Sequence, residues 1–342
     1  MPRSTRFGLM ILAALLLIGG GYTAFWFLAA RRIEAGIVDW AQSQRADKID
    51  VSWQRVRVSG YPVAFRVDLG SAALRDGAIT PSPELHVPVL SGTARPWNFA
   101  DWRLAAPDGF TADLAAAGRG TPAKLIAQSA DGVVSIGPEG GWTLRLTLGE
   151  TTVEGGAPVL VGSARATLTV PPRPSPGHAD PATALAVEAS RIKLPAAIAP
   201  FGDTIDELDF AAEEKGSIPS GKLADAVAAW RDAGGKIELD NLRLKWGALD
   251  ATATGTIGLD QELQPASGFS AVIKGYDQIL SALVQNGQMR ASDAGLARIA
   301  LTFLAKAGPD GKPEIRTAFT IQNGEMFLGP AKLGRTPRIT WE

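Results

Sequence analysis

The segment IELDNLRLKWGALDATATGTIGL, residues 237–259, indicates the fold class most directly, because it predicts two strands and the turn between them. Residues 237–246 form the first run, which is rich in Leu, and residues 249–259 form the second, in which Leu and Ile occur with three Thr. Gly247 lies between the runs, at the position of a tight turn. Two apolar runs joined by a short turn predict adjacent antiparallel strands.

The N-terminal half of the chain carries the same signals. Apolar residues alternate with Ala, Arg and Asp over residues 63–69, and with Thr and Arg over residues 142–148. A period of two with one apolar face is typical of a half-buried strand. Further strands are predicted at residues 84–90, 124–128, 132–136 and 159–170. Since no helical periodicity occurs between residues 52 and 170, this half is predicted to be an all-β layer.

The C-terminal half mixes strands with helices. Residues 223–230 have apolar side chains at helical spacing, and Gly234-Gly235 follows as a C-terminal stop. Two more helices are expected over residues 277–284 and 292–304, with Asp277 and Ser292 as N-caps. Strands are expected over residues 185–194 and 269–273.

The C-terminal ending contains the strongest local signal in the chain. Residues 315–321 alternate into Asn323-Gly324, and residues 326–328 return. Asn and Gly tolerate the positive φ that both central residues of a type I′ turn require. We therefore predict a β-hairpin with a two-residue turn at this position.

These elements predict a mainly β fold with some α-helix: an N-terminal transmembrane helix, then a large curved antiparallel β-sheet structure with a few packed helices. The proposed division is 1–30 membrane anchor, 31–170 amphipathic helix plus N-terminal β region, 171–181 Pro-rich loop or linker, and 182–342 C-terminal α+β region. Four prolines in residues 171–177 cannot donate to a sheet. This break is either a true linker or a loop within one continuous sheet.

The anchor is predicted from residues 7–30, FGLMILAALLLIGGGYTAFWFLAA, which contain no charged residue. At 1.5 Å per residue this helix is about 36 Å long, enough to cross a hydrocarbon core of about 30 Å. Aromatic residues near its far end fit an interfacial belt. The alternative is a secretory signal cleaved after Ala30. The short N-terminal tail favours a cytoplasmic N-terminus, with the large domain in the periplasm and the anchor in the inner membrane.

Residues 31–46 continue as a predicted amphipathic helix with Ile33, Ile37, Trp40 and Ala41 on one face. The helix is either a stalk or packs on the first sheet. We favour packing, because Trp40 at the centre of the apolar face needs burial.

The composition is that of a folded protein, with 46% hydrophobic and 20% charged residues and a net charge of −1. The near-neutral charge argues against nucleic-acid binding. With no Cys among 342 residues, there is no disulfide framework and no thiolate metal site.

Several blocks of the chain resemble one bacterial family. They are WRDAGGKIELDNLRLKWGALDATATGTIGLD (230–260), GYDQILSALVQNGQM (275–289), FTIQNGEMFLGPAKLG (319–334) and, in the N-terminal part, VSWQRVRVSGYPVAFRVDL (51–69). The chain is similar in these blocks to an uncharacterised proteobacterial family, domain of unknown function 2125. A looser likeness links the ending to AsmA-like envelope proteins, whose folded-over β-sheets form an apolar groove implicated in lipid handling. The first family has no established activity, so the resemblance implies no catalytic residues.

The residues themselves also predict no catalytic centre. His86 lies in a predicted strand and His178 in the Pro-rich break, and neither has metal-ligand neighbours at suitable spacing. The Gly60-Tyr61-Pro62 segment and the Gly-rich segment 137–141 are predicted turns. The acidic residues between Asp203 and Glu214 are expected on a solvated helix face or loop. Six Trp residues either line a ligand groove or belong to the core or rim of a sheet: Trp53, Trp97, Trp102, Trp142, Trp230 and Trp246.

The sequence therefore favours a non-enzymatic, membrane-anchored envelope protein that binds or passes lipid or another apolar molecule. The alternative is an envelope scaffold or interaction module with no ligand of its own. No catalytic, cofactor-binding or metal residue is predicted and no cofactor is expected. The expected partners are the lipid bilayer, through the N-terminal helix, and a lipid ligand or an envelope protein. The residues of the apolar groove are not identified by the sequence.

Overall fold

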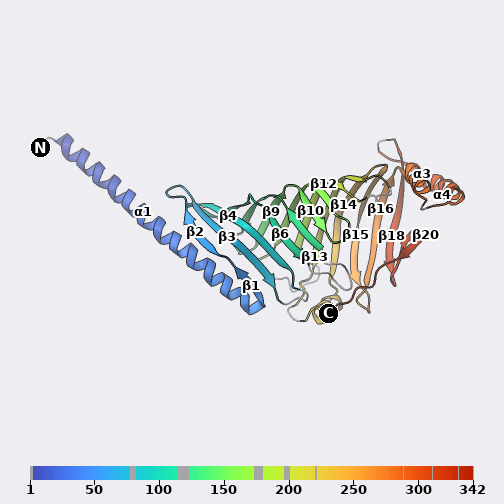
Figure 1. The fold of residues 1–342 in the computed structure, drawn as a ribbon, viewed down its shortest axis with the longest axis horizontal. Coiled ribbons are helices and arrows are strands. Elements are labelled where there is room, and N and C mark those ends of the chain that lie inside the picture. The colour runs from blue at the N-terminus through green and yellow to red at the C-terminus, as the bar shows by residue number, and fades with distance from the viewer. Residues whose placement is uncertain are drawn as a thin grey trace.

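The computed structural model describes residues 3–77, 82–114, 123–172, 180–195, 201–219, 222–287, 289–309, 311–329 and 331–341. Within these ranges, one 20-stranded sheet contains all the strands, and every pairing is antiparallel. The molecule is elongated: α1 projects from one end, the strands follow along the long axis, and α3 and α4 lie at the other end (Figure 1). The predicted fold class, mainly β with some α, is confirmed.

The first helix, α1 (Arg3–Gln44), joins the predicted anchor and the predicted amphipathic helix in one element of 42 residues, and a short 3-10 turn, η1 (Arg45–Asp47), follows. Residues Leu12–Gln44 are long and apolar enough to cross a membrane. The predicted burial of Trp40 is wrong, because its side chain is 51% exposed. At this level of the helix Ala41 and Gln42 face β1, so the contact stripe has moved round the helix, away from Trp40.

The strands before the Pro-rich break make the half of the sheet next to α1. They are β1 (Ile49–Ser52), β2 (Arg55–Ser59), β3 (Phe65–Asp76), β4 (Glu84–Arg95), β5 (Asn98–Ala106), β6 (Phe110–Leu114), β7 (Ala123–Ala127), β8 (Ala130–Ile136), β9 (Trp142–Leu148), β10 (Thr151–Glu154) and β11 (Val159–Val170). The predicted all-β layer is confirmed over the described residues of this half.

Three strand positions in this half are interrupted side by side. β5 and β6 both pair with β4, and β9 and β10 both pair with β11. Between them, β8 pairs with β5 and β9, and β7 pairs with β6 and β10, so each of the three pairs is one strand with a break. The breaks at residues 107–109, 128–129 and 149–150 are adjacent, since Gln128 N donates to Glu150 O at 2.9 Å and Gly149 N to Ser129 O at 3.0 Å. We call this line of breaks the crease. Extra residues in a strand bend it and increase its twist, so the crease helps the sheet to curl.

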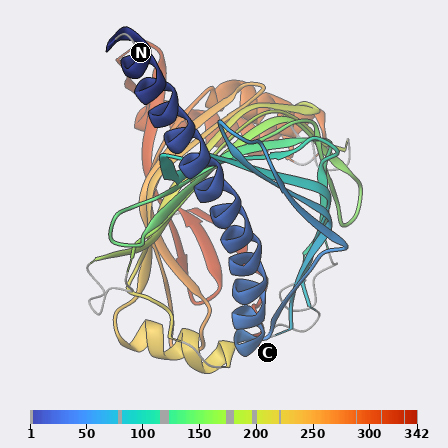
Figure 2. The same ribbon diagram turned by 90° about the vertical axis from the view of Figure 1, so that its left-hand side faces the viewer.

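The rest of the chain forms the second half of the sheet and three helices. The elements are β12 (Pro181–Lys193), β13 (Thr204–Lys215), α2 (Leu223–Asp232), β14 (Lys236–Trp246), β15 (Leu249–Leu259), β16 (Pro265–Lys274), α3 (Tyr276–Gln285), α4 (Ala291–Leu304), β17 (Lys306–Ala307), β18 (Pro313–Gln322), β19 (Glu325–Leu328) and β20 (Ala331–Arg335). Viewed along the long axis, the sheet curls into a trough, with α1 across the near end and α2 at the lower margin (Figure 2).

The C-terminal hairpin has the predicted geometry. Asn323 and Gly324 have φ values of 54° and 71°, and Ile321 pairs with Met326 across the turn. The helix caps differ from prediction: the N-caps of α3 and α4 are Gly275 and Arg290, not Asp277 and Ser292. Gly275 is required because its φ is +73° and a Cβ would lie 1.9 Å from the carbonyl oxygen of Ala248.

The acidic stretch was expected on a helix face or loop, and this prediction is wrong, because most of it forms β13. Its carboxylates are tolerated in a central strand because basic residues of β14 lie opposite them: Lys245 Nζ is 2.5 Å from Glu207 Oε2. Residues 173–179 of the Pro-rich break, His178 among them, lie outside the described residues. The flanking strands β11 and β12 pair over Leu160 to Lys193 within the same sheet. The division of the chain into domains stays a prediction.

Candidate functional site

One face of the sheet is apolar along nearly its whole length. Residues directly opposite each other in an antiparallel pair point to the same face, so the registers trace a row of side chains across the sheet. From β3 to β18 this apolar row is Val67, Gly92, Leu104, Gly132, Leu146, Ala166, Val187, Phe210, Leu242, Ala253, Ala271 and Thr317. Only the last residue carries a polar group.

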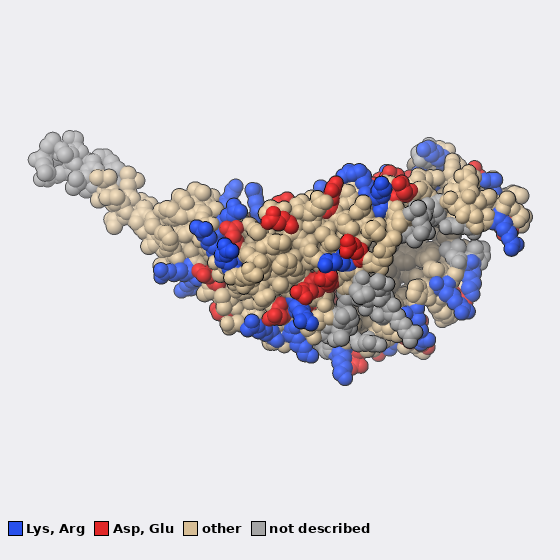
Figure 3. All heavy atoms as spheres, in the orientation of Figure 1, with Lys and Arg blue, Asp and Glu red and all other residues tan. Residues whose placement is uncertain are grey.

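The row one residue along points to the opposite face and is mostly polar. It consists of Asp68, Ser91, Ala105, Asp131, Thr147, Arg165, Glu188, Asp209, Arg243, Thr252, Val272 and Arg316. The space-filling view shows acidic and basic side chains spread over the body of the molecule, whereas the described part of α1 that projects beyond this body shows no charged side chain (Figure 3). The sheet is thus amphipathic across its width.

The apolar face is incompletely covered. The accessible surface is 20994 Å², whereas a compact monomer of this mass would expose about 13,000 Å². Among the described residues only Phe65 is a large side chain buried to below 2% exposure. The two helices that lie against the apolar face, α1 and α2, are on the hollow side of the curl (Figure 2). Most residues of the apolar row are only partly buried, so the protein's own side chains leave part of this face accessible.

Helix α2 covers one part of the apolar face and borders a partly open cavity of about 440 Å³, which we call the chamber. Its wall is almost entirely apolar and comprises Thr183, Leu185, Phe210, Ala212, Glu214, Ile218, Leu223, Val227, Trp230, Ile237, Ile257, Gly258, Leu259 and Trp341. Trp230 is buried, and its Nε1 donates to the carbonyl oxygens of Lys215 at 3.1 Å and Gly216 at 2.8 Å. These bonds fix the indole ring and hold α2 to the end of β13.

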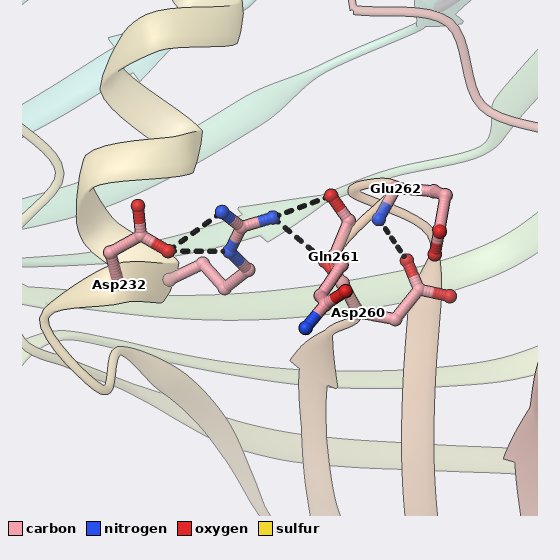
Figure 4. Close-up of polar contacts among 5 residues, drawn as sticks. Asp232, Asp260, Gln261 and Glu262 are labelled. Carbon is pink, nitrogen blue, oxygen red and sulfur yellow. Dashed lines mark hydrogen bonds and ion pairs between the residues drawn. The ribbon is translucent and has the colours of Figure 1, made fainter.

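A single turn, residues 260–264 between β15 and β16, fastens α2 from the other side (Figure 4). Nη1 of Arg231 donates to Asp260 O at 3.0 Å and to Gln261 O at 2.9 Å. The Asp260 carboxylate in turn accepts from the backbone N–H of Glu262 at 3.0 Å and of Gln264 at 2.8 Å. The turn is therefore internally rigid where the helix is attached.

The same turn holds the C-terminal tail over the chamber. Gln264 exchanges two hydrogen bonds with the backbone of Ile339, at 3.0 Å and 2.9 Å. Trp341 Nε1 donates to Leu263 O at 2.8 Å, and its ring lines the chamber. The cover thus depends on two segments that are far apart in sequence and share one turn.

A second apolar groove lies between α1 and the sheet. It has a volume of about 270 Å³ and is lined by Ile33, Ile37, Val67, Leu69, Leu90, Gly92, Trp102 and Leu104. Because its sheet residues belong to the apolar face, this groove and the chamber open on the same surface. We call it the α1 groove.

Another cavity, of about 730 Å³, lies between α3, α4 and the strand ends, and its lining is partly polar and partly apolar. Arg298 pairs there with Asp277, and Lys274 lies 4.0 Å from buried Glu314. Lys274 and Arg298 on its wall thus each lie close to a carboxylate.

The polar face has its own electrostatic structure. A hydrogen bond from Lys245 lowers the pKa of Glu207 despite an opposing contribution from desolvation, and Arg243 adds to the lowering. Burial raises the pKa of Asp209, and the negative charge of Glu207 raises it further. These carboxylates lie among cross-strand ion pairs, and the described residues include no group of three or more His, Cys, Asp or Glu that could hold a metal ion.

The Trp residues singled out by the sequence are not brought together. Trp230 lines the chamber and Trp102 the α1 groove, whereas Trp97 is exposed on the β4–β5 turn. His86 lies exposed in β4, as expected for a strand residue. Sequence reasoning missed Trp341 and the aliphatic wall of the chamber. The period-two pattern marks those aliphatic residues as one face of a strand but does not show which strands α2 covers.

Comparisons with known proteins give a match to one protein family. No curated protein and no solved structure matches the chain. The likeness to AsmA-like proteins therefore stays a prediction. Residues 26–337 match the family described as an uncharacterised protein conserved in bacteria, DUF2125. Since the match covers most of the chain, this protein, with its candidate N-terminal membrane helix, belongs to the DUF2125 family.

Proposed function

We propose that this protein is anchored in the inner membrane, faces the periplasm, and binds the acyl chains of a lipid or another apolar molecule on the apolar face of its sheet. The observation that carries the proposal is the apolar row, which crosses the sheet from β3 to β18 and in which every residue except Val67 stays partly exposed. The proposal includes no catalytic step and no cofactor.

An open apolar face of this size has a physical cost in water. Each Å² of apolar surface removed from water stabilises a complex by about 25 cal/mol, so an acyl chain lying along the face gains from burial at every strand it crosses. The chamber of about 440 Å³ falls within the usual range of ligand pockets. Helix α1 keeps the sheet beside a bilayer, which is the source of such molecules.

Photo-cross-linking in the living cell tests the proposal. Phe210→p-benzoylphenylalanine puts a photoreactive ring of similar shape into the chamber wall. Ala211→p-benzoylphenylalanine is the matched control, because the neighbouring residue of a strand points to the opposite face. After irradiation we expect mass spectrometry to find a lipid-sized adduct on the variant at residue 210 and none on the variant at residue 211.

A chamber-filling variant makes the assay more specific. Ala212→Phe adds a ring to the chamber wall and should abolish the adduct at residue 210, since Ala212 lies on the same face of β13. The proposal is wrong if residue 210 gives no lipid adduct, or if residues 210 and 211 give the same adducts in equal yield.

A scaffold role is the alternative, and α4 is the observation that favours it. Leu296, Ile299 and Phe303 recur along one side of this helix and are exposed, Phe303 to 86%. Exposed apolar side chains grouped in this way are typical of protein contacts. A scaffold would cross-link reproducibly to one protein through α4 and would tolerate Ala212→Phe.

A further inference from the structure

Part of the apolar run on α1 that forms the anchor also contacts the sheet, and the number of shared residues can be counted. The apolar run begins at residue 7, but the loop between β2 and β3 already contacts α1 at Tyr22. The run below that contact, residues 7–21, is about 22 Å long at 1.5 Å per residue. A hydrocarbon core of about 30 Å needs about five residues more, which brings Trp26 to its boundary.

The loop that meets these residues is residues 60–64, which we call the hairpin tip. The Tyr22 hydroxyl donates to Pro62 O, and Trp26 Nε1 donates to Ala64 O at 3.1 Å. The hydroxyl groups of Thr23 and Tyr61 lie 2.7 Å apart. Each of these polar groups would be costly in a bilayer without a partner, and each has one.

Aromatic packing joins the hairpin tip firmly to α1. Trp26 stacks on Phe65 with ring centroids 5.0 Å apart and planes at 9°, and Phe65 is fully buried. Trp26 also meets Tyr61 edge to face at 5.5 Å. Because the tip is fixed to this turn of the helix, it must accompany α1 to whatever depth Trp26 occupies.

The exposed side chains of the hairpin tip are suited to the same depth in the bilayer as Trp26. Residues 60–64, GYPVA, carry no charge, and Val63 is 66% exposed. Tyr61 and Phe27 are also largely exposed and stack with centroids 5.9 Å apart. Aromatic rings with one polar end prefer the interfacial region of a bilayer, where one side is apolar and the other is wet.

We propose that the hairpin tip is a second membrane contact, seated in the interfacial region of the bilayer that α1 crosses. The contact orients the sheet, since a single helix could rotate about its own axis but a helix plus a laterally placed loop cannot. Ile33 follows Trp26 by seven residues, so the α1 groove begins about 10 Å from the hydrocarbon boundary. This inference rests on the proposed function and deepens it: the acyl chain would enter at the α1 groove.

Single-cysteine labelling tests the contact cleanly, because the native chain has no Cys. Val63→Cys in the full-length protein is labelled with the fluorophore NBD and reconstituted into phosphatidylcholine–phosphatidylglycerol vesicles. Some vesicles carry a nitroxide quencher high on the acyl chain. Gly156→Cys, on the exposed turn between β10 and β11, is the control, because a Cβ there meets nothing within 4 Å. Leu16→Cys reports on α1 itself.

We expect a blue-shifted emission and loss of fluorescence with quencher lipids at residue 63, and neither at residue 156. Quenching at residue 16 without quenching at residue 63 would overturn the hairpin contact and leave the anchor standing. Quenching at neither residue 16 nor residue 63 would overturn both. The cross-link from residue 210 is independent of these outcomes, so failure of lipid binding is recognised separately.

Discussion

Replacing Arg231 by Met tests how the chamber is closed. The guanidinium donates to Asp260 O and Gln261 O at 3.0 and 2.9 Å, and the side chain is 21% exposed. A hydrogen bond from a charged group contributes about 1.5–3 kcal/mol, and one between neutral groups about 0.5–1.5 kcal/mol. Because solvent partly screens this guanidinium, we take about 1–1.5 kcal/mol for each bond and about 2–3 kcal/mol for both.

The variant should loosen α2 without unfolding the sheet. Met keeps the aliphatic stem, and Trp230 remains buried with its two backbone hydrogen bonds. Local opening of α2 should therefore become more frequent. Since about 1.4 kcal/mol is a factor of ten, the loss corresponds to amide exchange in α2 that is roughly 30–150-fold faster.

Hydrogen–deuterium exchange of the full-length protein, read on peptides covering Leu223–Asp232, measures this opening. Arg165→Met is the matched control, because Arg165 bonds Glu188 on the polar face, at 2.6 Å, with both side chains well exposed. It should leave α2 unchanged. The reasoning is refuted if Arg231→Met does not speed exchange in α2, or if it speeds exchange in β12 to β15 equally, which would indicate global destabilisation.

Three further predictions concern the sheet. Gly109→Ala should destabilise the protein by roughly 2–5 kcal/mol, because the φ of Gly109 is +67° and a Cβ would lie 1.9 Å from the carbonyl oxygen of Ala127. The control Gly140→Ala, where φ is +97° but a Cβ meets nothing, should cost only about 1–2 kcal/mol in the same thermal melt. Equal losses of stability in the two variants would contradict the role of the crease. Gly324→Val should likewise cost about 1–2 kcal/mol through backbone strain alone, so an unchanged melting temperature would contradict the type I′ turn. Lys245 holds the pKa of Glu207 below its ordinary value of 4.5, so the ion pair stabilises the fold fully above about pH 4.5, and this stabilisation is lost as pH falls through the lowered pKa. The difference in unfolding free energy between wild type and Lys245→Met should therefore shrink on acidification. A difference that is independent of pH would contradict the ion pair.

The sequence predicted the elements best where the signal is short-range. The strand over residues 142–148, the helix around Trp230 and the hairpin at Asn323-Gly324 are all present, because alternation, helical spacing and turn chemistry act within about ten residues. The predictions failed where a distant partner decides. The acidic residues of β13 form a strand because Lys245 and Arg243 lie opposite them on β14.

The candidate site was the least predictable feature. Alternation indicates that Leu185 or Phe210 faces one side of a strand, but the apolar row exists only because the registers of many strand pairs bring such residues into line. The helix containing Trp230 was expected, whereas its place over the chamber depends on Arg231 reaching a turn about 30 residues later in the chain. Trp341 had no sequence signal, since its role follows from a hydrogen bond to Leu263.

The apolar N-terminal helix and the amphipathic strands could be recognised from the sequence alone, because both depend on runs or periodic patterns of neighbouring residues. Three features could be seen only in the folded chain: the strands join into one curled sheet, α1 and α2 partly cover its apolar face, and the hairpin tip meets α1 at Trp26. Those features depend on pairings between residues far apart in the chain, whose alignment is set by register, bulges and packing together.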